Sequence, residues 1–296
     1  MSSDNIIVKL NGGLGNQMFQ WALARMIEER TDIKTLLDMS YFKKGYARAY
    51  QLGIFKLKAS FVEDFWTKSK LELMWFFRKQ ITWGRCLGIN LYSESCFQFD
   101  SNINRVKPNT HVEGFFQSER YFKSIENILR NDFAFVEPPE GENRKLVQQI
   151  QATNSISLHI RRGDYVQKKR YQNAYADCSL DYYKRGVEHI MELLENKSVP
   201  PVLYIFSDDI DWVKNNLKLP YESIYVAHNT GDKSYEDMRL MSLCKHNIIA
   251  NSSFSWWGAW LNKNPDKVVI APQKWFNDEK IVQTDIIPET WIRLEN

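Results

Sequence analysis

The feature that most constrains the fold is a series of short, β-branched segments that each end abruptly in a polar or glycine-rich run. At the start of the chain a strand is predicted over Asn5–Leu10, and the run NGGLGNQ follows it. A helix from about Asn16 to Arg30 comes next, because its apolar residues recur at helical spacing. With a second strand at Lys34–Leu37, this order is typical of parallel strands joined by a helix.

The second half of the chain continues the alternation of strands and helices. Helices are predicted after Ser179 and after Ser234, and each serine is expected to cap the first turn with its hydroxyl group. The strands are placed at Ile156–Ile160, Val202–Phe206, Ser223–Val226, Asn247–Ala250 and Val268–Ala271. The sequence therefore predicts an α/β fold of two facing, Rossmann-like, doubly wound halves.

A linker is predicted at Phe135–Asn143, because the run FVEPPEGEN is dense in proline and charge. It divides the chain into an N-terminal domain, 1–143, and a C-terminal domain, 144–296. The composition is 44% hydrophobic and 25% charged, which is ordinary for folded domains of this size.

Charge and targeting signals narrow the functional classes. The net charge of +3 is too small to indicate a nucleic-acid partner. We find no secretory signal and no apolar run of about 18–20 residues, so a cytoplasmic location is expected. The four cysteines show neither a CxxC motif nor the spacing of metal ligands, which favours reduced thiols and no metal.

Residues 61–91 combine aromatic side chains, such as Phe65, Trp66 and Trp75, with several lysines and arginines. A basic, aromatic helix of this kind can lie on an anionic membrane surface, which would make the protein peripheral to the inner face of a membrane. A helix packed against its own domain explains the same residues, and both interpretations stay open.

The polar runs after the strands are candidates for binding, because ligands of open parallel sheets lie beyond the carboxyl ends of the strands. Arg161 and Arg162 directly follow a predicted strand, and guanidinium groups match phosphate oxygens. Successive side chains point in different directions, so one arginine can face a ligand while the other pairs with a carboxylate such as Asp164. The alternative is a solvated surface turn.

The run NSSFSWWG, which begins at Asn251, is the second candidate for anion binding. Its serines and the N–H groups at a helix start form the kind of site that anions occupy. A simple cap on a tryptophan-rich core helix is the alternative, and the two can hold together because both use the same donors.

Two further runs allow several interpretations. The glycines of NGGLGNQ permit close approach of a ligand, but Met18 stands where a dinucleotide-binding motif needs a third glycine. Asp38 would suit a ribose contact, so an NAD(P)-dependent oxidoreductase stays an alternative. In SDDID, Asp208 and Asp209 can chelate a metal, cap a helix or bind a ribose or a base.

Four motifs in their order along the chain resemble those of the α-1,2-fucosyltransferases, glycosyltransferase family 11: GGLGNQMFQ (Gly12–Gln20), HIRRGDY (His159–Tyr165), FSDD (Phe206–Asp209) and NSSFSWWGAWL (Asn251–Leu261). The segment EGFFQSERYF (Glu113–Phe122) is also similar to a segment of that family. The resemblance implies a GT-B-like fold and metal-independent, inverting transfer of L-fucose from GDP-β-L-fucose to the 2-hydroxyl group of a terminal galactose. A GT-B enzyme that uses another sugar nucleotide is the alternative.

The resemblance also implies roles for residues. Arg161 contacts the diphosphate, and His159 and Asp164 complete the catalytic group. The acceptor contacts are Glu113, Gln117 and Trp257. The residues do not identify the general base: Asp164 and Glu113 are candidates, Asn16 or Gln17 could orient the hydroxyl group without ionising, and late loss of the proton to the leaving phosphate would make a base dispensable. The expected donor contacts are Gly12, Gly15, Asn16, Gln17, Arg162, Ser207, Asp208, Asp209, Asn251, Ser252, Ser253, Phe254 and Ser255. Because the first strand begins almost at the N-terminus, the chain resembles bacterial members, which would build lipid-linked polysaccharide units.

Overall fold

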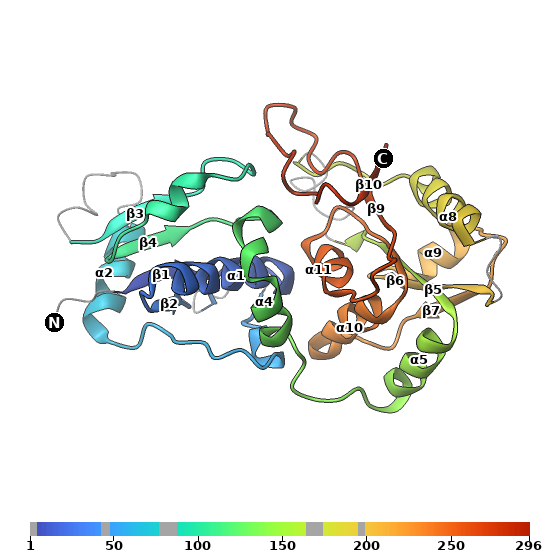
Figure 1. The fold of residues 1–296 in the computed structure, drawn as a ribbon, viewed down its shortest axis with the longest axis horizontal. Coiled ribbons are helices and arrows are strands. Elements are labelled where there is room, and N and C mark those ends of the chain that lie inside the picture. The colour runs from blue at the N-terminus through green and yellow to red at the C-terminus, as the bar shows by residue number, and fades with distance from the viewer. Residues whose placement is uncertain (1–4, 43–47, 77–87, 164–173, 195–198) are drawn as a thin grey trace. The chain divides into compact units, whose positions relative to one another are not determined.

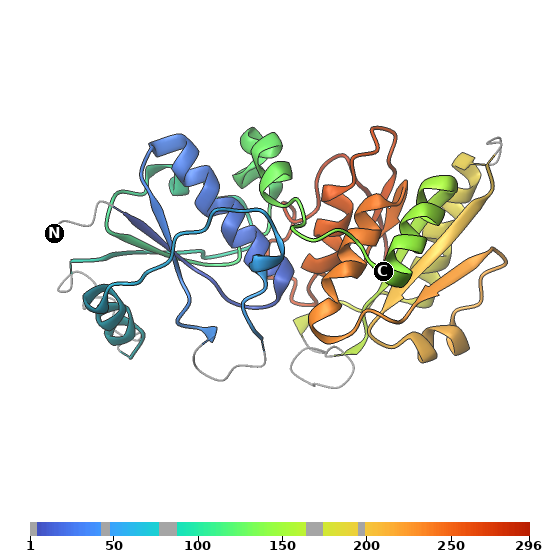
Figure 2. The same cartoon turned by 90° about the horizontal axis from the view of Figure 1, so that it is seen from below.

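The structure is a computed structural model that describes residues 5–42, 48–76, 88–163, 174–194 and 199–296. The chain forms two compact units (Figures 1 and 2). The first contains Met1–Glu137 and Thr284–Ile286, and the second contains Pro138–Gln283 and Ile287–Asn296. The predicted boundary at 143/144 falls inside helix α5 (Gly141–Ala152), because that helix packs on the second unit through α10 and β5.

The first unit is built on a parallel sheet in the order β2-β1-β4-β3. Its strands are β1 (Ile6–Lys9), β2 (Thr35–Asp38), β3 (Asn90–Ser93) and β4 (Thr110–Glu113). Helix α1 (Leu14–Thr31) connects β1 to β2, which confirms the predicted β–α–β unit. The shorter helices are α2 (Phe65–Phe76) and α4 (Glu126–Asp132), and single 3₁₀ turns lie at Leu52–Ile54, Ser101–Arg105, Glu119–Tyr121 and Lys123–Ile125.

Helix α2 occupies part of the basic, aromatic segment 61–91. Leu71 is buried and packs with Ile7 and Val62 of the first unit, as the own-domain interpretation requires. Phe65 and Trp66 are nevertheless 73% and 75% exposed. Residues 77–87 lie outside the described part of the chain, and β3 begins at Asn90.

The second unit contains a six-stranded parallel sheet in the order β10-β9-β8-β5-β6-β7. The strands are β5 (Asn154–Ile160), β6 (Pro201–Ser207), β7 (Ser223–Val226), β8 (His246–Ile248), β9 (Val269–Pro272) and β10 (Ile292–Leu294). The helices besides α5 are α8 (Leu180–Leu194), α9 (Ile210–Asn216), α10 (Tyr235–Leu243) and α11 (Ser253–Leu261), with a 3₁₀ turn at Gly231–Lys233. The five strands predicted for this half are confirmed.

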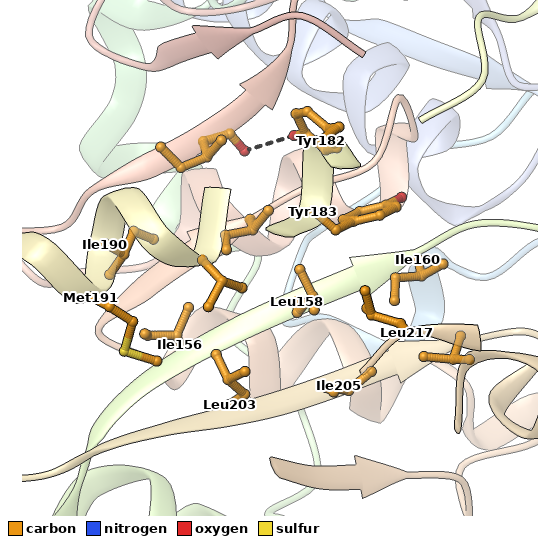
Figure 3. Packing of buried hydrophobic residues seen from close by; sticks show 14 of the residues in the cluster. Ile156, Leu158, Ile160, Tyr182, Tyr183, Ile190, Met191, Leu203, Ile205 and Leu217 are labelled. Atoms are coloured by element: carbon orange, nitrogen blue, oxygen red, sulfur yellow. Dashed lines mark hydrogen bonds between the residues drawn. The ribbon is translucent and has the colours of Figure 1, made fainter. Parts of the chain in front are cut away.

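Both faces of the second sheet are covered. Leu203 and Ile205 of β6 lie in one apolar cluster with Tyr182 and Tyr183 of α8, and Figure 3 shows this packing. The alternate residues Val202, Tyr204 and Phe206 lie in a second cluster with α5 and α10. Successive side chains of a strand point to opposite faces, so a strand that is apolar throughout must be buried on both.

Two predicted helix caps have different outcomes. The Ser179 hydroxyl accepts a hydrogen bond from the N–H of Tyr182 (3.1 Å), which confirms it as the cap of α8. The Ser234 side chain makes no capping hydrogen bond to α10. The backbone of Ser234 is already helical (φ −58°, ψ −21°), because the preceding 3₁₀ turn leads directly into the helix.

Candidate functional site

The second sheet has one point at which the order of its strands reverses. In the second unit the chain begins at β5, adds β6 and β7 on one side and then β8, β9 and β10 on the other. Loops that leave neighbouring strands at such a reversal diverge to opposite faces of the sheet, and ligands bind in the crevice between them. The end of β5, which leads to Arg161, and the end of β8, which leads to Asn251–Ser255, border this point.

The two arginines after β5 are paired with the two aspartates after β6. Nη1 of Arg161 lies 3.2 Å from Oδ2 of Asp208, whose Oδ1 accepts the backbone N–H of Arg162 (2.8 Å). Gly163 is required here, because a Cβ atom would lie only 2.6 Å from Oδ2 of Asp208. The observed carboxylate partners thus come from the neighbouring strand, whereas the predicted partner Asp164 lies outside the described residues.

Arg162 and Asp209 form the second ion pair between these two loops. Nε of Arg162 lies 3.3 Å from Oδ2 of Asp209, and its guanidinium carbon lies 3.3 Å from the centre of the Trp212 ring. Asp209 also caps α9 by accepting the N–H of Trp212 (3.3 Å), and Ser207 accepts the N–H of Asp209 (3.0 Å). The predicted helix cap in SDDID is therefore Asp209.

His159 lies in β5 on the border of the reversal point. It is 5% exposed, and its ring centre is 5.9 Å from that of Phe254 in α11, so residues from both borders meet here. Burial lowers the pKa of His159 to about 4, against the opposing effect of Asp208, and Arg161 adds to the lowering. The imidazole is therefore neutral at pH 7 and can donate and accept one hydrogen bond each.

The first turn of α11 completes this border. The Ser252 hydroxyl caps the helix by accepting the N–H of Phe254 (3.3 Å). The side chains of Ser253 and Phe254 are only partly buried, as a ligand contact requires. Ser255 is buried, with its hydroxyl directed to the Ala250 carbonyl. The first-turn N–H groups of a helix have no partners within the helix, so this turn can bind an anion.

Two residues that were predicted to contact a substrate, Trp257 and Asn251, are held inside the protein by contacts with its own residues. Trp257 is fully buried between Trp256 and Trp260, with ring centres 5.0 and 5.1 Å away, so it belongs to the core and not to a sugar-binding surface. The Asn251 amide donates to the carbonyl groups of Ala176 and Trp275 and thereby fixes the segment after β8.

In the first unit β1 and β4 are the two neighbouring central strands of the sheet. Gly12 follows β1 with φ +77°, and a Cβ atom there would lie 2.6 Å from Nδ2 of Asn16. Oδ1 of Asn16 accepts a hydrogen bond from the Gln117 amide (2.8 Å), and Glu113 pairs with Lys9 (2.8 Å). The structure thus brings together the predicted contacts Asn16 and Gln117, whereas the partner of Glu113 is Lys9.

Glutamines in α1 hold the ends of the strands in place. The Gln17 amide donates to Gly12 and Ala49 carbonyls and accepts the N–H of Gln51, so its predicted donor contact would compete with three internal hydrogen bonds. Gln20 joins Asn11 to Gly114 in the same way. Gly15 is buried within the first turn of α1.

The surroundings of Asp38 do not support the alternative of an NAD(P)-dependent oxidoreductase. Asp38 is buried and accepts hydrogen bonds from Ser40 and His111, so it is not presented to a ribose as an oxidoreductase would require.

Within the described residues no group of three or more His, Cys, Asp or Glu is placed to hold a metal ion. Cys96, Cys178 and Cys244 are free thiols. No helix in the described ranges has the length and the apolar character needed to cross a bilayer.

Comparison with known proteins identifies the family of the chain. Residues 93–295 match the model of glycosyl transferase family 11. An alpha-1,2-colitosyltransferase of Escherichia coli is 35% identical over 98% of this chain and 99% of its own length. The E. coli O-antigen biosynthesis glycosyltransferase WbnK is 31% identical over 96% of this chain and 99% of its own.

A structural relative supports the fold. The fucosyltransferase NodZ from Bradyrhizobium superposes with a TM-score of 0.51 over 87% of this chain and 92% of its own, at 14% identity. That protein shares the GT-B architecture of two α/β units that the sequence predicts here. The chain is a glycosyltransferase and belongs to glycosyl transferase family 11.

Proposed function

We propose that this protein is an inverting α-1,2-fucosyltransferase that transfers L-fucose from GDP-β-L-fucose to the 2-hydroxyl group of a terminal β-galactose. The observation that carries the proposal is the pair of anion-binding elements at one reversal point, Arg161 after β5 and the first turn of α11 after β8. A diphosphate offers the charge and the oxygen atoms that such a pair binds.

The chemistry follows from where charge develops. As the bond between the anomeric carbon and the phosphate oxygen breaks, negative charge grows on the departing GDP. A fixed guanidinium group close to that oxygen stabilises the transition state more than the bound donor, which is the condition for catalysis. Asp208 holds Arg161 in place before the donor binds.

The donor sugar has a second candidate, because the first of the two E. coli relatives is a colitosyltransferase. Colitose is L-fucose without the 3-hydroxyl group, so the two donors present the same diphosphate and differ by one polar group. A site that hydrogen-bonds the 3-hydroxyl would reject the deoxy sugar strongly, whereas an apolar site would discriminate little.

The cellular role is proposed from the same relatives. Both E. coli proteins cover nearly the whole of this chain, and WbnK is an enzyme of O-antigen biosynthesis. We propose that this protein fucosylates a galactose-terminated polysaccharide precursor on the cytoplasmic side of a bacterial membrane.

A GDP-release assay tests the donor and the acceptor together. Purified protein is incubated with GDP-fucose or GDP-colitose and with a panel of β-galactosides, including lactose, N-acetyllactosamine and Galβ1,3GalNAc. We expect GDP release that depends on the acceptor and is fastest with GDP-fucose, with an α-1,2 linkage in the product. Faster turnover of GDP-colitose would contradict the donor, and release with neither donor on any acceptor would contradict the reaction.

A further inference from the structure

A connected series of titratable, mostly buried side chains lies on three neighbouring strands of the first sheet, and the sequence did not predict it. Asp38 ends β2, Lys9 ends β1, and His111 and Glu113 belong to β4. The register aligns Lys9 with Asp38 and Val8 with Val112, which sets Lys9 beside Glu113. His111 and Glu113 are two residues apart, so both side chains leave the same face of β4.

The distances connect these groups in series. Nε2 of His111 lies 3.2 Å from Oδ2 of Asp38, and Nδ1 of His111 lies 3.6 Å from Oε1 of Glu113. The same Glu113 oxygen accepts a hydrogen bond from Nζ of Lys9 (2.8 Å). The side chain of His111 is 4% exposed and that of Glu113 is 17% exposed. Of these two residues, Glu113 is therefore the more accessible to a substrate.

Asp38 fixes the proton on the imidazole. Burial alone would raise the pKa of Asp38, but the hydrogen bonds from His111 and Ser40 lower it, and the pKa is left below its ordinary value. An ionised Asp38 accepts the Nε2 proton, as the aspartate of a catalytic triad orients its histidine. In the tautomer that carries its proton on Nε2, the Nδ1 lone pair faces Oε1 of Glu113.

The Nδ1 atom of His111 is buried and makes no hydrogen bond in the described structure. An unsatisfied buried acceptor costs about 1–3 kcal/mol, so its retention calls for an explanation. A proton arriving on Glu113 supplies one, because a protonated carboxyl can donate to Nδ1. The unsatisfied atom is thus matched to the state in which Glu113 has just accepted a proton.

We propose that Glu113 is the general base of the transfer reaction and that His111, held by Asp38, is the positioning residue that stabilises protonated Glu113. The inference rests on the proposed function. As the acceptor oxygen bonds to the anomeric carbon, its proton passes to Glu113, and the electron pair of the broken C–O bond leaves with GDP. Lys9 balances the charge of Glu113 before the reaction. The other candidate base, Asp164, belongs to residues 164–173, which lie outside the described part of the chain, and it is the one carboxyl residue of that segment.

The central experiment compares an acceptor that must lose a proton with one that need not. Glu113→Gln is assayed with a β-galactoside and with azide, and GDP affinity is measured by calorimetry. We expect transfer to the galactoside to fall by about 10²–10⁴, while GDP affinity and transfer to azide stay near wild type. Glu126→Gln is the matched control, because Glu126 pairs with Arg130 elsewhere in the first unit.

Supporting variants separate proton transfer from folding. Lys9→Met/Glu113→Gln removes both charges together, so no buried ammonium is left unpaired, and it is expected to show the same difference between galactoside and azide. His111→Gln and Asp38→Asn are expected to lower kcat about tenfold and to alter its pH profile, with the KM for the donor unchanged.

The outcomes divide cleanly. Near-wild-type transfer to the galactoside by Glu113→Gln overturns the inference, and so does a parallel loss with azide. The same selective loss in Asp164→Asn, without one in Glu113→Gln, assigns the base to Asp164. Absence of transfer by the wild-type protein, with GDP bound, overturns the proposed function itself.

Discussion

At the scale of single residues, the two adjacent arginines after β5 have different surroundings. Arg162 is held between Asp209 and the face of Trp212, where a guanidinium group stacks well on an indole. Arg161 is held by Asp208 beside the strand end that borders the reversal point. This difference favours Arg161 as the proposed anion contact, and it makes Arg162 a residue that joins β5 to α9.

Replacement of Arg161 tests that distinction. We expect Arg161→Ala to lower kcat by roughly two orders of magnitude, about 3 kcal/mol of lost transition-state stabilisation, because the guanidinium acts where charge develops. Steady-state GDP-release kinetics measure the change. Arg162→Ala serves as the comparison and is expected to lower thermal stability more than turnover. Turnover by Arg161→Ala at the wild-type rate would remove Arg161 from the catalytic group.

His159 makes stability depend on pH in a defined direction. Its pKa is lowered to about 4 in the folded protein, chiefly by burial, from the ordinary value of 6.5. The unfolded chain therefore binds the proton first, and the free energy of unfolding falls as the pH decreases from about 6.5 toward 4. Above about pH 6.5 the contribution is constant.

Urea unfolding at several pH values measures this contribution. Between pH 7 and pH 5 the wild-type protein is expected to lose roughly 2 kcal/mol through His159. His159→Gln should lack that part of the decrease while other titrating groups act equally on both proteins. Identical pH dependence of the two proteins would show that His159 is not held neutral by the fold.

At the scale of elements, helix α11, whose first turn is the proposed anion site, is fixed at both ends. Ser252 caps the N-terminus of α11, and Nζ of Lys267 donates to the carbonyl oxygens of Ala259 and Asn262 at the C-terminus (2.8 Å each). A cation at the C-terminus complements the helix dipole. The first turn can therefore hold its N–H groups toward a ligand without local rearrangement.

Helix α2 carries the prediction of peripheral membrane contact. Phe65 and Trp66 are exposed, and Lys70 is exposed on the same helix, so the helix offers aromatic and cationic groups to an anionic lipid surface. We expect wild-type protein to float with vesicles of phosphatidylglycerol and phosphatidylethanolamine. Phe65→Ser/Trp66→Ser should reduce the bound fraction several-fold and leave turnover on a soluble acceptor unchanged. Equal flotation of the two proteins would contradict a role for α2.

At the scale of the whole molecule, each unit is built on a parallel sheet whose first strand is central, β1 in one unit and β5 in the other. Polar groups lie at the ends of these strands and of their neighbours, with Asn16, Gln117 and Glu113 in the first unit and Arg161 and Ser252 in the second. The proposed transfer needs sites for two substrates, and we propose these two groups of residues for them.

Most of the second unit was predictable from the sequence, because its strands are buried on both faces and read as continuous apolar runs bounded by polar ones. In the first unit β3 and β4 were not predicted. Each has four residues, β3 is largely exposed, and β4 contains His111 and Glu113, so neither shows an apolar pattern.

The sequence by itself determined which residues follow the strands and hence the candidates Arg161, Asp208 and Ser252, since apolar periodicity is a local property. Only the tertiary structure decided which of them pair, that Trp257 is a core residue, and that Lys9, Asp38, His111 and Glu113 meet. The physical reason is that these contacts join strands far apart along the chain, and register and burial, which set them, arise only when the sheet assembles.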